Sequence, residues 1–220
     1  MIDKPRTGTT RAAEPLILVI DDDLSMRQAL TNLLESIGLH VEGFGTAREL
    51  LDGTLPATAN CMILDIRLPG LSGLDLQTEL AKAKVNIPII FMTGHGDIPM
   101  TVKAMKSGAI DFLTKPFRDQ DLLDAVATAL ERDRKRRTDE KVVGDLQALV
   151  DALTPRELQV MTLVTEGKMN KQIAHELGIS EITVKIHRGS LMKKMGAQSL
   201  ADLVRMAGVL GLRNAKAPER

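Results

Sequence analysis

The sequence predicts an α/β protein, in which a doubly wound, five-stranded parallel sheet is joined by a helical linker to a small all-α helix-turn-helix domain. Short apolar runs alternate with amphipathic helical patterns over residues 16–130, which is typical of a parallel sheet covered by helices. After a densely charged stretch, the remaining patterns are all helical. A chain of 220 residues has room for two domains of these sizes.

Five short apolar runs are expected to be strands, at 16–20, 40–44, 61–65, 87–92 and 110–114. Helical patterns follow them at 26–37, 46–52, 74–84, 97–107 and 119–132. Ser25 is the predicted N-cap of the first helix, and Asp97 with Pro99 opens the fourth. Strands and helices that alternate in this way predict a flavodoxin-like order of strands.

The second half of the chain begins with a linker at 131–153. Its first part, 131–141, mixes both charge signs densely, so it fits a solvated linker or a helix extension, and the apolar spacing after it would continue the helix. Thr154 and Glu157 form a predicted capping box at the start of a domain that spans 154–212. Helical patterns at 154–166, 170–177, 181–195 and 199–210 follow, and residues 170–195 fit a helix-turn-helix.

Composition and charge limit the classes of function. Hydrophobic residues make up 44% and charged residues 26%, as in ordinary globular proteins. The polar start, with residues 1–15 as a flexible tail, lacks a secretory signal, and no apolar run is long enough for a membrane span, so we expect a cytoplasmic protein without membrane contact. With one cysteine, an intramolecular disulfide is excluded. Net charge is −6 over residues 16–130 and +4 over 151–220, so the basic part could bind an anionic partner.

Polar residues follow four of the predicted strands directly. Asp21 and Asp22 end the first, Asp65 the third, Thr93 the fourth and Lys115 the fifth. Each has an ordinary explanation by itself, as a turn carboxylate, a cap or a surface lysine. Because the carboxyl ends of parallel strands share one edge, however, these side chains are expected to converge there.

This set of residues suits phosphoryl transfer. The three carboxylates would bind a hard divalent cation such as Mg²⁺. Asp65 could then attack phosphorus as a nucleophile. Thr93 could donate a hydrogen bond to a phosphoryl oxygen, and Lys115 could supply a compact positive charge to another.

The same residues carry a family resemblance. Residues 16–130 resemble the receiver domain of bacterial two-component response regulators, through VIDDD, LDIRLPG, MTG and TKPF. The run TGHGDIPMTVKAMKSGAIDFLTKPF is most similar to the FixJ-type subgroup. The last part resembles the LuxR/NarL-type helix-turn-helix domain, through LTPRELQVM, NKQIAHELGISEITVKIHR and LMKKM.

The receiver resemblance implies a role for each residue of the site. Asp65 would accept a phosphoryl group from a sensor histidine kinase. Mg²⁺ would be bound by Asp21, Asp22, Asp65 and the backbone carbonyl of Arg67. Thr93 and Lys115 would sense the phosphoryl group, Phe112 would be the aromatic switch residue, and the Lys115–Pro116 bond would be cis. The protein would form a homodimer on phosphorylation, through the face around 97–107 and 110–114.

The helix-turn-helix resemblance implies that residues 181–195 lie in the major groove of double-stranded DNA. The candidate contacts are Thr183, Lys185, Ile186, Arg188, Lys193 and Lys194, of which the last two would hold phosphates. Family members often carry a polar residue where this chain has Gly189, so the sequence readout could differ there. A dimer would bind a pseudo-palindromic promoter site, with RNA polymerase as a further partner.

The expected function is therefore a phosphorylation-dependent transcription regulator, with activation the usual outcome in this subgroup. It would be a phosphoacceptor that dephosphorylates itself rather than an enzyme. One alternative is a phosphorylation-independent DNA-binding protein that uses the receiver only to dimerise. Another is an Asp-nucleophile phosphatase that acts on a small phosphate ester. A substrate-recognition cap domain would favour that alternative, but this chain has a helix-turn-helix instead. We assign no role to Asp23 and interpret His95 as a loop residue.

Overall fold

The computed structural model describes residues 14–53, 55–56, 58–94 and 98–212. The chain divides into two compact units, Met1–Arg136 and Arg137–Arg220. Among the described residues, every helix is too short or too polar to cross a membrane.

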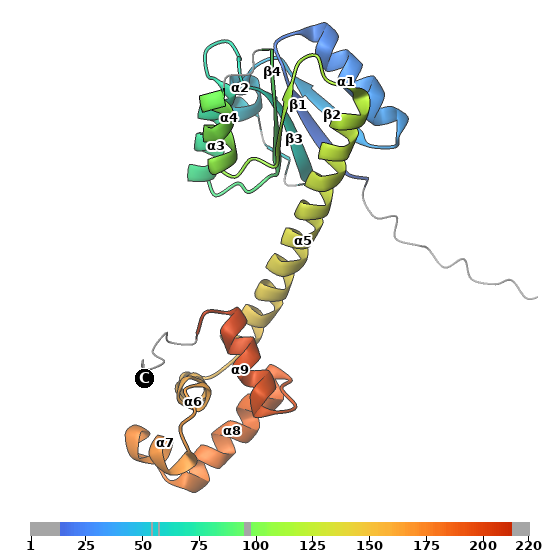
Figure 1. Ribbon diagram of the computed structural model, residues 1–220. Coiled ribbons are helices and arrows are strands. Elements are labelled where there is room, and N and C mark those ends of the chain that lie inside the picture. The colour runs from blue at the N-terminus through green and yellow to red at the C-terminus, as the bar shows by residue number, and fades with distance from the viewer. Residues whose placement is uncertain (1–13, 54, 57, 95–97, 213–220) are drawn as a thin grey trace, which may run out of the picture. The chain divides into compact units, whose positions relative to one another are not determined.

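The first unit is built on the predicted five-stranded parallel sheet (Figure 1). Its strands are β1 Leu16–Ile20, β2 His40–Phe44, β3 Ala59–Asp65, β4 Ile89–Thr93 and β5 Asp111–Thr114. They lie in the order β2-β1-β3-β4-β5, and each neighbouring pair is parallel. This is the flavodoxin-like order. From β1 the chain adds β2 on one side of the sheet and β3 to β5 on the other, and this switch leaves a crevice at the carboxyl ends of β1 and β3.

Helices follow the strands at α1 Leu24–Ser36, α2 Ala47–Asp52, α3 Gly73–Lys82, α4 Ile98–Lys106 and α5 Asp119–Asp151. The prediction of Ser25 as the first N-cap is wrong. Asp23 caps α1 instead, because its Oδ1 accepts the Ser25 amide at 2.8 Å and the Met26 amide at 3.3 Å, an arrangement that contributes about 1 kcal/mol. The predicted helix start at Asp97 and the loop residue His95 lie outside the described residues.

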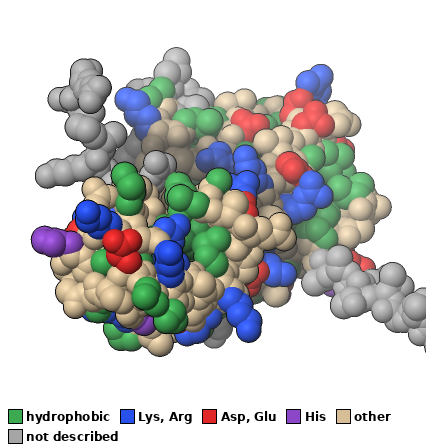
Figure 2. All heavy atoms as spheres, turned by 90° about the horizontal axis from the view of Figure 1, so that it is seen from below, with side chains coloured by type: hydrophobic (Ala, Val, Ile, Leu, Met, Phe, Trp, Pro, Cys, Tyr) green, Lys and Arg blue, Asp and Glu red, His purple; other side chains and the backbone are tan. Residues whose placement is uncertain are grey.

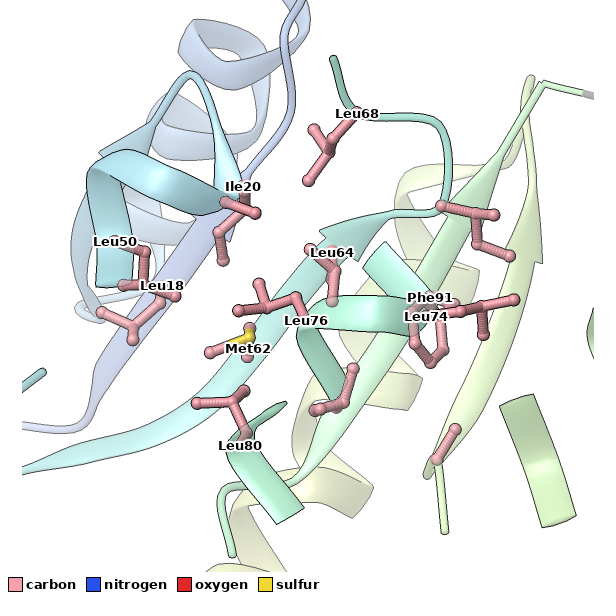
Figure 3. Close-up of a cluster of buried hydrophobic side chains, with 14 of the residues drawn as sticks. Leu18, Ile20, Leu50, Met62, Leu64, Leu68, Leu74, Leu76, Leu80 and Phe91 are labelled. Atoms are coloured by element: carbon pink, nitrogen blue, oxygen red, sulfur yellow. The ribbon is translucent and has the colours of Figure 1, made fainter. Parts of the chain in front are cut away.

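Both faces of the sheet are buried, so its central strands consist mainly of apolar residues. On β1, Leu18 and Ile20 contribute to one core and Ile17 and Val19 to the other. The first core also takes side chains from β3, β4, α2 and α3, which converge in Figure 3. The second core includes side chains of α1 and α5. This two-sided burial explains why runs such as LILVI show no polar alternation.

Helix α5 is a single helix of 33 residues that includes most of the predicted linker. Within its densely charged stretch, Asp133 is fully buried and its Oδ2 accepts the Asn60 side-chain amide at 2.8 Å. Asn60 Oδ1 in turn accepts the Leu16 amide at 3.0 Å. This polar junction holds α5 against the start of β1 and β3. The charge pattern had indicated only a solvated linker or helix extension, because it does not distinguish one buried carboxylate from exposed ones.

The second unit comprises α6 Pro155–Thr165, α7 Asn170–Leu177, α8 Glu181–Met195 and α9 Leu200–Val209. Thr154 and Glu157 form the predicted capping box. Gly178 makes the turn between α7 and α8 with a φ of 64°, in the left-handed region that favours glycine. The core includes Val184 and Leu191 on the inner side of α8, and both are fully buried.

Candidate phosphorylation site and DNA-binding helix

Three carboxylates meet at the carboxyl edge of the sheet. Asp21 and Asp22 follow β1, and Asp65 ends the neighbouring β3. One oxygen from each lies within 4.8 Å of the others, in a cluster where Asp21 and Asp65 are buried and Asp22 is exposed. The predicted convergence of these three side chains is therefore present.

Lys115 joins this cluster from the end of β5. Its Nζ donates to Asp21 Oδ2 at 2.5 Å and to Asp65 Oδ2 at 2.6 Å. The lysine side chain is only 17% exposed, so it is not an ordinary surface lysine. Its backbone amide donates to the Thr93 carbonyl at 2.7 Å, and the bond to Pro116 is cis. Thr93 itself is buried at the end of β4.

The charges in this cluster are unbalanced. Burial raises the pKa of Asp21, and the hydrogen bond from Lys115 offsets this only in part. Burial alone would lower the pKa of Lys115, but its hydrogen bonds to Asp21 and Asp65 outweigh that effect and raise it. Like charges about 4 Å apart repel by about 4 kcal/mol at an effective dielectric constant of 20. One ammonium cannot balance three carboxylates, so the cluster favours a further cation.

The loop after Asp65 is closely packed against it. The Arg67 amide donates to Asp65 Oδ1 at 2.8 Å. At the first residue of α3, a Cβ on Gly73 would lie 2.3 Å from the Asp65 carbonyl oxygen, so a side chain here would displace the backbone of the site. Gly73 precedes the helix predicted at 74–84, so the helical pattern did not indicate this role. The available signal was a glycine just after the capping Ser72, where glycine has no advantage for helix formation.

Phe112, the predicted switch aromatic, lies on β5 directly opposite Phe91 of β4. It is partly buried and packs against the first core. The side chain therefore contacts the core on one side and is partly exposed to solvent. Its role as a switch stays a prediction.

The predicted DNA-contacting residues fall into two groups on α8. Lys185, Ile186 and Lys193 are exposed. The other three have side-chain partners within the domain. Thr183 is half-buried, and its hydroxyl is hydrogen-bonded to that of the N-cap Ser180 at 2.9 Å. Arg188 Nη1 donates to Asn170 Oδ1 at 2.6 Å, which links α8 to the start of α7. Lys194 Nζ donates to Glu157 Oε2 at 2.7 Å, so a phosphate would compete with this carboxylate for it.

Comparison with known proteins decides the family. The family model of the response regulator receiver domain matches residues 17–127. The family model of the bacterial regulatory proteins of the LuxR family matches residues 151–207. The chain belongs to the two-component response regulators that carry a LuxR-type DNA-binding domain. The receiver thus contains the carboxylate cluster, and the DNA-binding domain contains α8.

Relatives of this response regulator match over nearly their whole length. Nodulation protein W of Bradyrhizobium diazoefficiens is 61% identical over 204 residues, which cover 93% of this chain and 90% of that protein. The transcriptional regulatory protein FixJ of the same species is 42% identical, covering 90% of this chain and 97% of that one. The solved structure of response regulator StyR has a TM-score of 0.78 at 49% identity, covering 89% of this chain and 99% of that one. The FixJ-type subgroup fits these similarities.

The receiver's carboxylate cluster fits a hard divalent cation by the chemistry of its donors. Carboxylate oxygens are the protein ligands that Mg²⁺ prefers. Asp22 is exposed, so the cluster is open to solvent, and the unbalanced negative charge favours a cation there.

In the DNA-binding domain of the response regulator, Glu157 is the centre of a buried polar network. Besides Lys194, Ser190 of α8 donates its hydroxyl to Glu157 Oε1, and the Thr154 amide donates to Oε2 at 2.8 Å. The hydrogen bonds from Lys194 and Ser190 lower the pKa of Glu157 to about 2. The network thus connects the start of α6 with the last turns of the predicted recognition helix.

We expect this carboxylate to make stability depend on pH. Because the pKa of Glu157 is lower in the folded than in the unfolded protein, its ionised form stabilises the fold above about pH 4.5, and this stabilisation is lost as the pH falls towards about 2. Glu157→Gln should therefore lower the melting temperature at pH 7 by more than at pH 3, as measured by circular dichroism of the full chain. The exposed Glu181→Gln serves as the control. An equal decrease at both pH values would contradict the role of the charge.

Proposed function

We propose that this response regulator accepts a phosphoryl group on Asp65 from a sensor histidine kinase and that phosphorylation promotes its binding to DNA. The observation that carries the proposal is the contact of the Lys115 ammonium with Asp65 Oδ2 at 2.6 Å, beside the carboxylate cluster. The nucleophile thus already has a cationic partner positioned to bind a phosphoryl oxygen.

The transfer follows from the residues at the sheet edge. An Asp65 carboxylate oxygen forms the new bond to phosphorus, while the bond from phosphorus to the imidazole nitrogen of the kinase histidine breaks and its electron pair stays on that nitrogen. Lys115 and the Thr93 hydroxyl would then bind phosphoryl oxygens. A Mg²⁺ held by Asp21, Asp22, Asp65 and the Arg67 carbonyl would neutralise charge on the phosphoryl group.

The aspartate is itself the product, so the protein is a phosphoacceptor rather than an enzyme with a separate substrate. Hydrolysis of the acyl phosphate by water would return the protein to its unphosphorylated state.

Phosphorylation adds roughly 1.5 to 2 negative charges, which changes the partners of Lys115 and Thr93. In our proposal, Phe112 then moves inward and the α4–β5 face becomes a dimer surface. Val102 and Met105 support this, because they are apolar side chains of α4 that are 45% and 44% exposed.

The output is transcription in the cytoplasm. In the proposed dimer, two copies of α8 enter successive major grooves of a pseudo-palindromic promoter site. Lys185 and Arg188 contact bases or phosphates, Thr183 and Ile186 contact base edges, and Lys193 and Lys194 bind phosphates. The DNA-bound dimer then acts as an activator by recruiting RNA polymerase.

The test is the molecular mass in solution with Mg²⁺, before and after acetyl phosphate or beryllofluoride. We expect a monomer that becomes a dimer, and no change in the Asp65→Asn variant. A dimer that forms without phosphorylation and is unaffected by it would favour the alternative, in which the receiver is only a dimerisation module. If phosphate is incorporated and the protein stays a monomer, the proposed switch by dimerisation is wrong.

A further inference from the structure

The DNA-binding domain exposes isoleucines where a solvated helix would carry polar residues. Among the large apolar side chains of the described residues, the three most exposed are Met169 at 71%, Ile182 at 70% and Ile186 at 65%. Two of them lie on α8. Figure 2 shows hydrophobic side chains interspersed with Lys and Arg side chains on the surface that faces the viewer.

The two isoleucines form one ridge. Residues four apart lie on the same face of a helix, and here that face is the one opposite the buried Val184 and Leu191. The exposed stripe of α8 consists of Glu181, Ile182, Lys185, Ile186, Gly189 and Lys193. It therefore mixes apolar side chains with charged ones, of which two are basic and one, Glu181 at its start, is acidic.

Gly189 lies on the same exposed stripe of α8, but it has no side chain. A Cβ at this position would meet no atom within 4 Å, so the glycine faces open space and is not required by packing inside the domain. Without a side chain, Gly189 makes no base contact of its own, and it lets another surface approach the helix closely next to Ile186. The readout of bases along this stripe then depends on its isoleucines and on Lys185.

The major groove offers one apolar group, the C5-methyl of thymine. Resting on the proposed binding of DNA by α8, we propose that Ile182 and Ile186 read thymine methyl groups and so make thymine a required base in each half-site. The two side chains are about 6 Å apart along the helix axis, which corresponds to about two base-pair steps of 3.4 Å. The required thymines should therefore lie within about two base pairs of each other.

The test uses the phosphorylated full-length protein and DNA duplexes selected from a random library. Each thymine of the selected half-site is then replaced by uracil, which removes only the methyl group. We expect uracil at two positions to weaken binding by about four-fold each, the effect of one buried methyl-sized group. Ile182→Ala and Ile186→Ala should weaken binding to the thymine site, and each should abolish the effect of uracil at one position.

The control variant is Ile37→Ala, which removes an isoleucine that is 54% exposed at the end of α1 in the receiver. It should bind both duplexes like the unmodified protein. If all duplexes with uracil bind as tightly as those with thymine, the inference is wrong while DNA binding stands. Alanine variants that weaken binding without any uracil effect would also overturn it and would indicate contacts to sugar or to the partner protomer. Failure to bind any duplex would overturn both this inference and the proposed DNA binding.

Discussion

Asp65→Asn is expected to abolish phosphorylation while the fold is retained. An amide is not a carboxylate nucleophile, so no phosphoryl bond can form at this position. The substitution is nearly isosteric, and the amide oxygen can still accept the Arg67 amide that lies 2.8 Å from Asp65 Oδ1. Intact-protein mass spectrometry after incubation with acetyl phosphate and Mg²⁺ should show a phosphorylated species for the unmodified protein and none for the variant.

The matched control is Asp52→Asn, which makes the same chemical change at an exposed carboxylate at the end of α2. It should be phosphorylated like the unmodified protein. Circular dichroism of both variants establishes that they are folded. Covalent phosphate in the Asp65→Asn variant would place the acceptor at another residue. The contacts of Asp65 with Lys115 and with the Arg67 amide would then need another explanation.

Lys115 is the residue for which the structure adds most to the sequence. The motif TKPF placed it after the fifth strand, and the order of strands brings it to the carboxylates although it lies 50 residues from Asp65 and 94 from Asp21. The topology was predictable because continuous apolar runs and helical periodicity repeat regularly in the receiver. The hydrogen bonds of Lys115 to both Asp21 and Asp65 could not be predicted, because they depend on the three-dimensional distances at the edge of the sheet.

Asp133 and Glu157 illustrate what sequence patterns leave out. Both lie among other charged residues in the sequence, and both are buried, at 0% and 4% exposure. Glu157 was predicted as a capping residue, which is confirmed, but its bonds to Ser190 and Lys194 join residues more than 30 positions away. Periodicity and capping rules describe interactions within one element, so such long-range polar networks remain invisible to them.

The combined variant Lys185→Ala and Arg188→Ala is expected to reduce DNA affinity strongly and to leave phosphorylation unchanged. Each basic side chain on α8 that contacts a base by two hydrogen bonds contributes about 1–3 kcal/mol, so the loss of two such contacts corresponds to about 30-fold or more. Fluorescence anisotropy with a labelled duplex at fixed salt measures the affinity, and mass spectrometry measures the phosphorylation.

Arg188 needs its own control, because it also donates to Asn170 Oδ1 and thereby ties α8 to α7. Asn170→Ala removes this internal bond and keeps the guanidinium. If Asn170→Ala loses as much affinity as Arg188→Ala, the arginine acts by positioning α8 rather than by touching DNA. If Asn170→Ala binds normally and the single Lys185→Ala and Arg188→Ala variants each lose affinity, both side chains contact the DNA. Unchanged affinity in the double variant would mean that α8 does not present this face to the groove, since Lys185 lies in the middle of its exposed stripe.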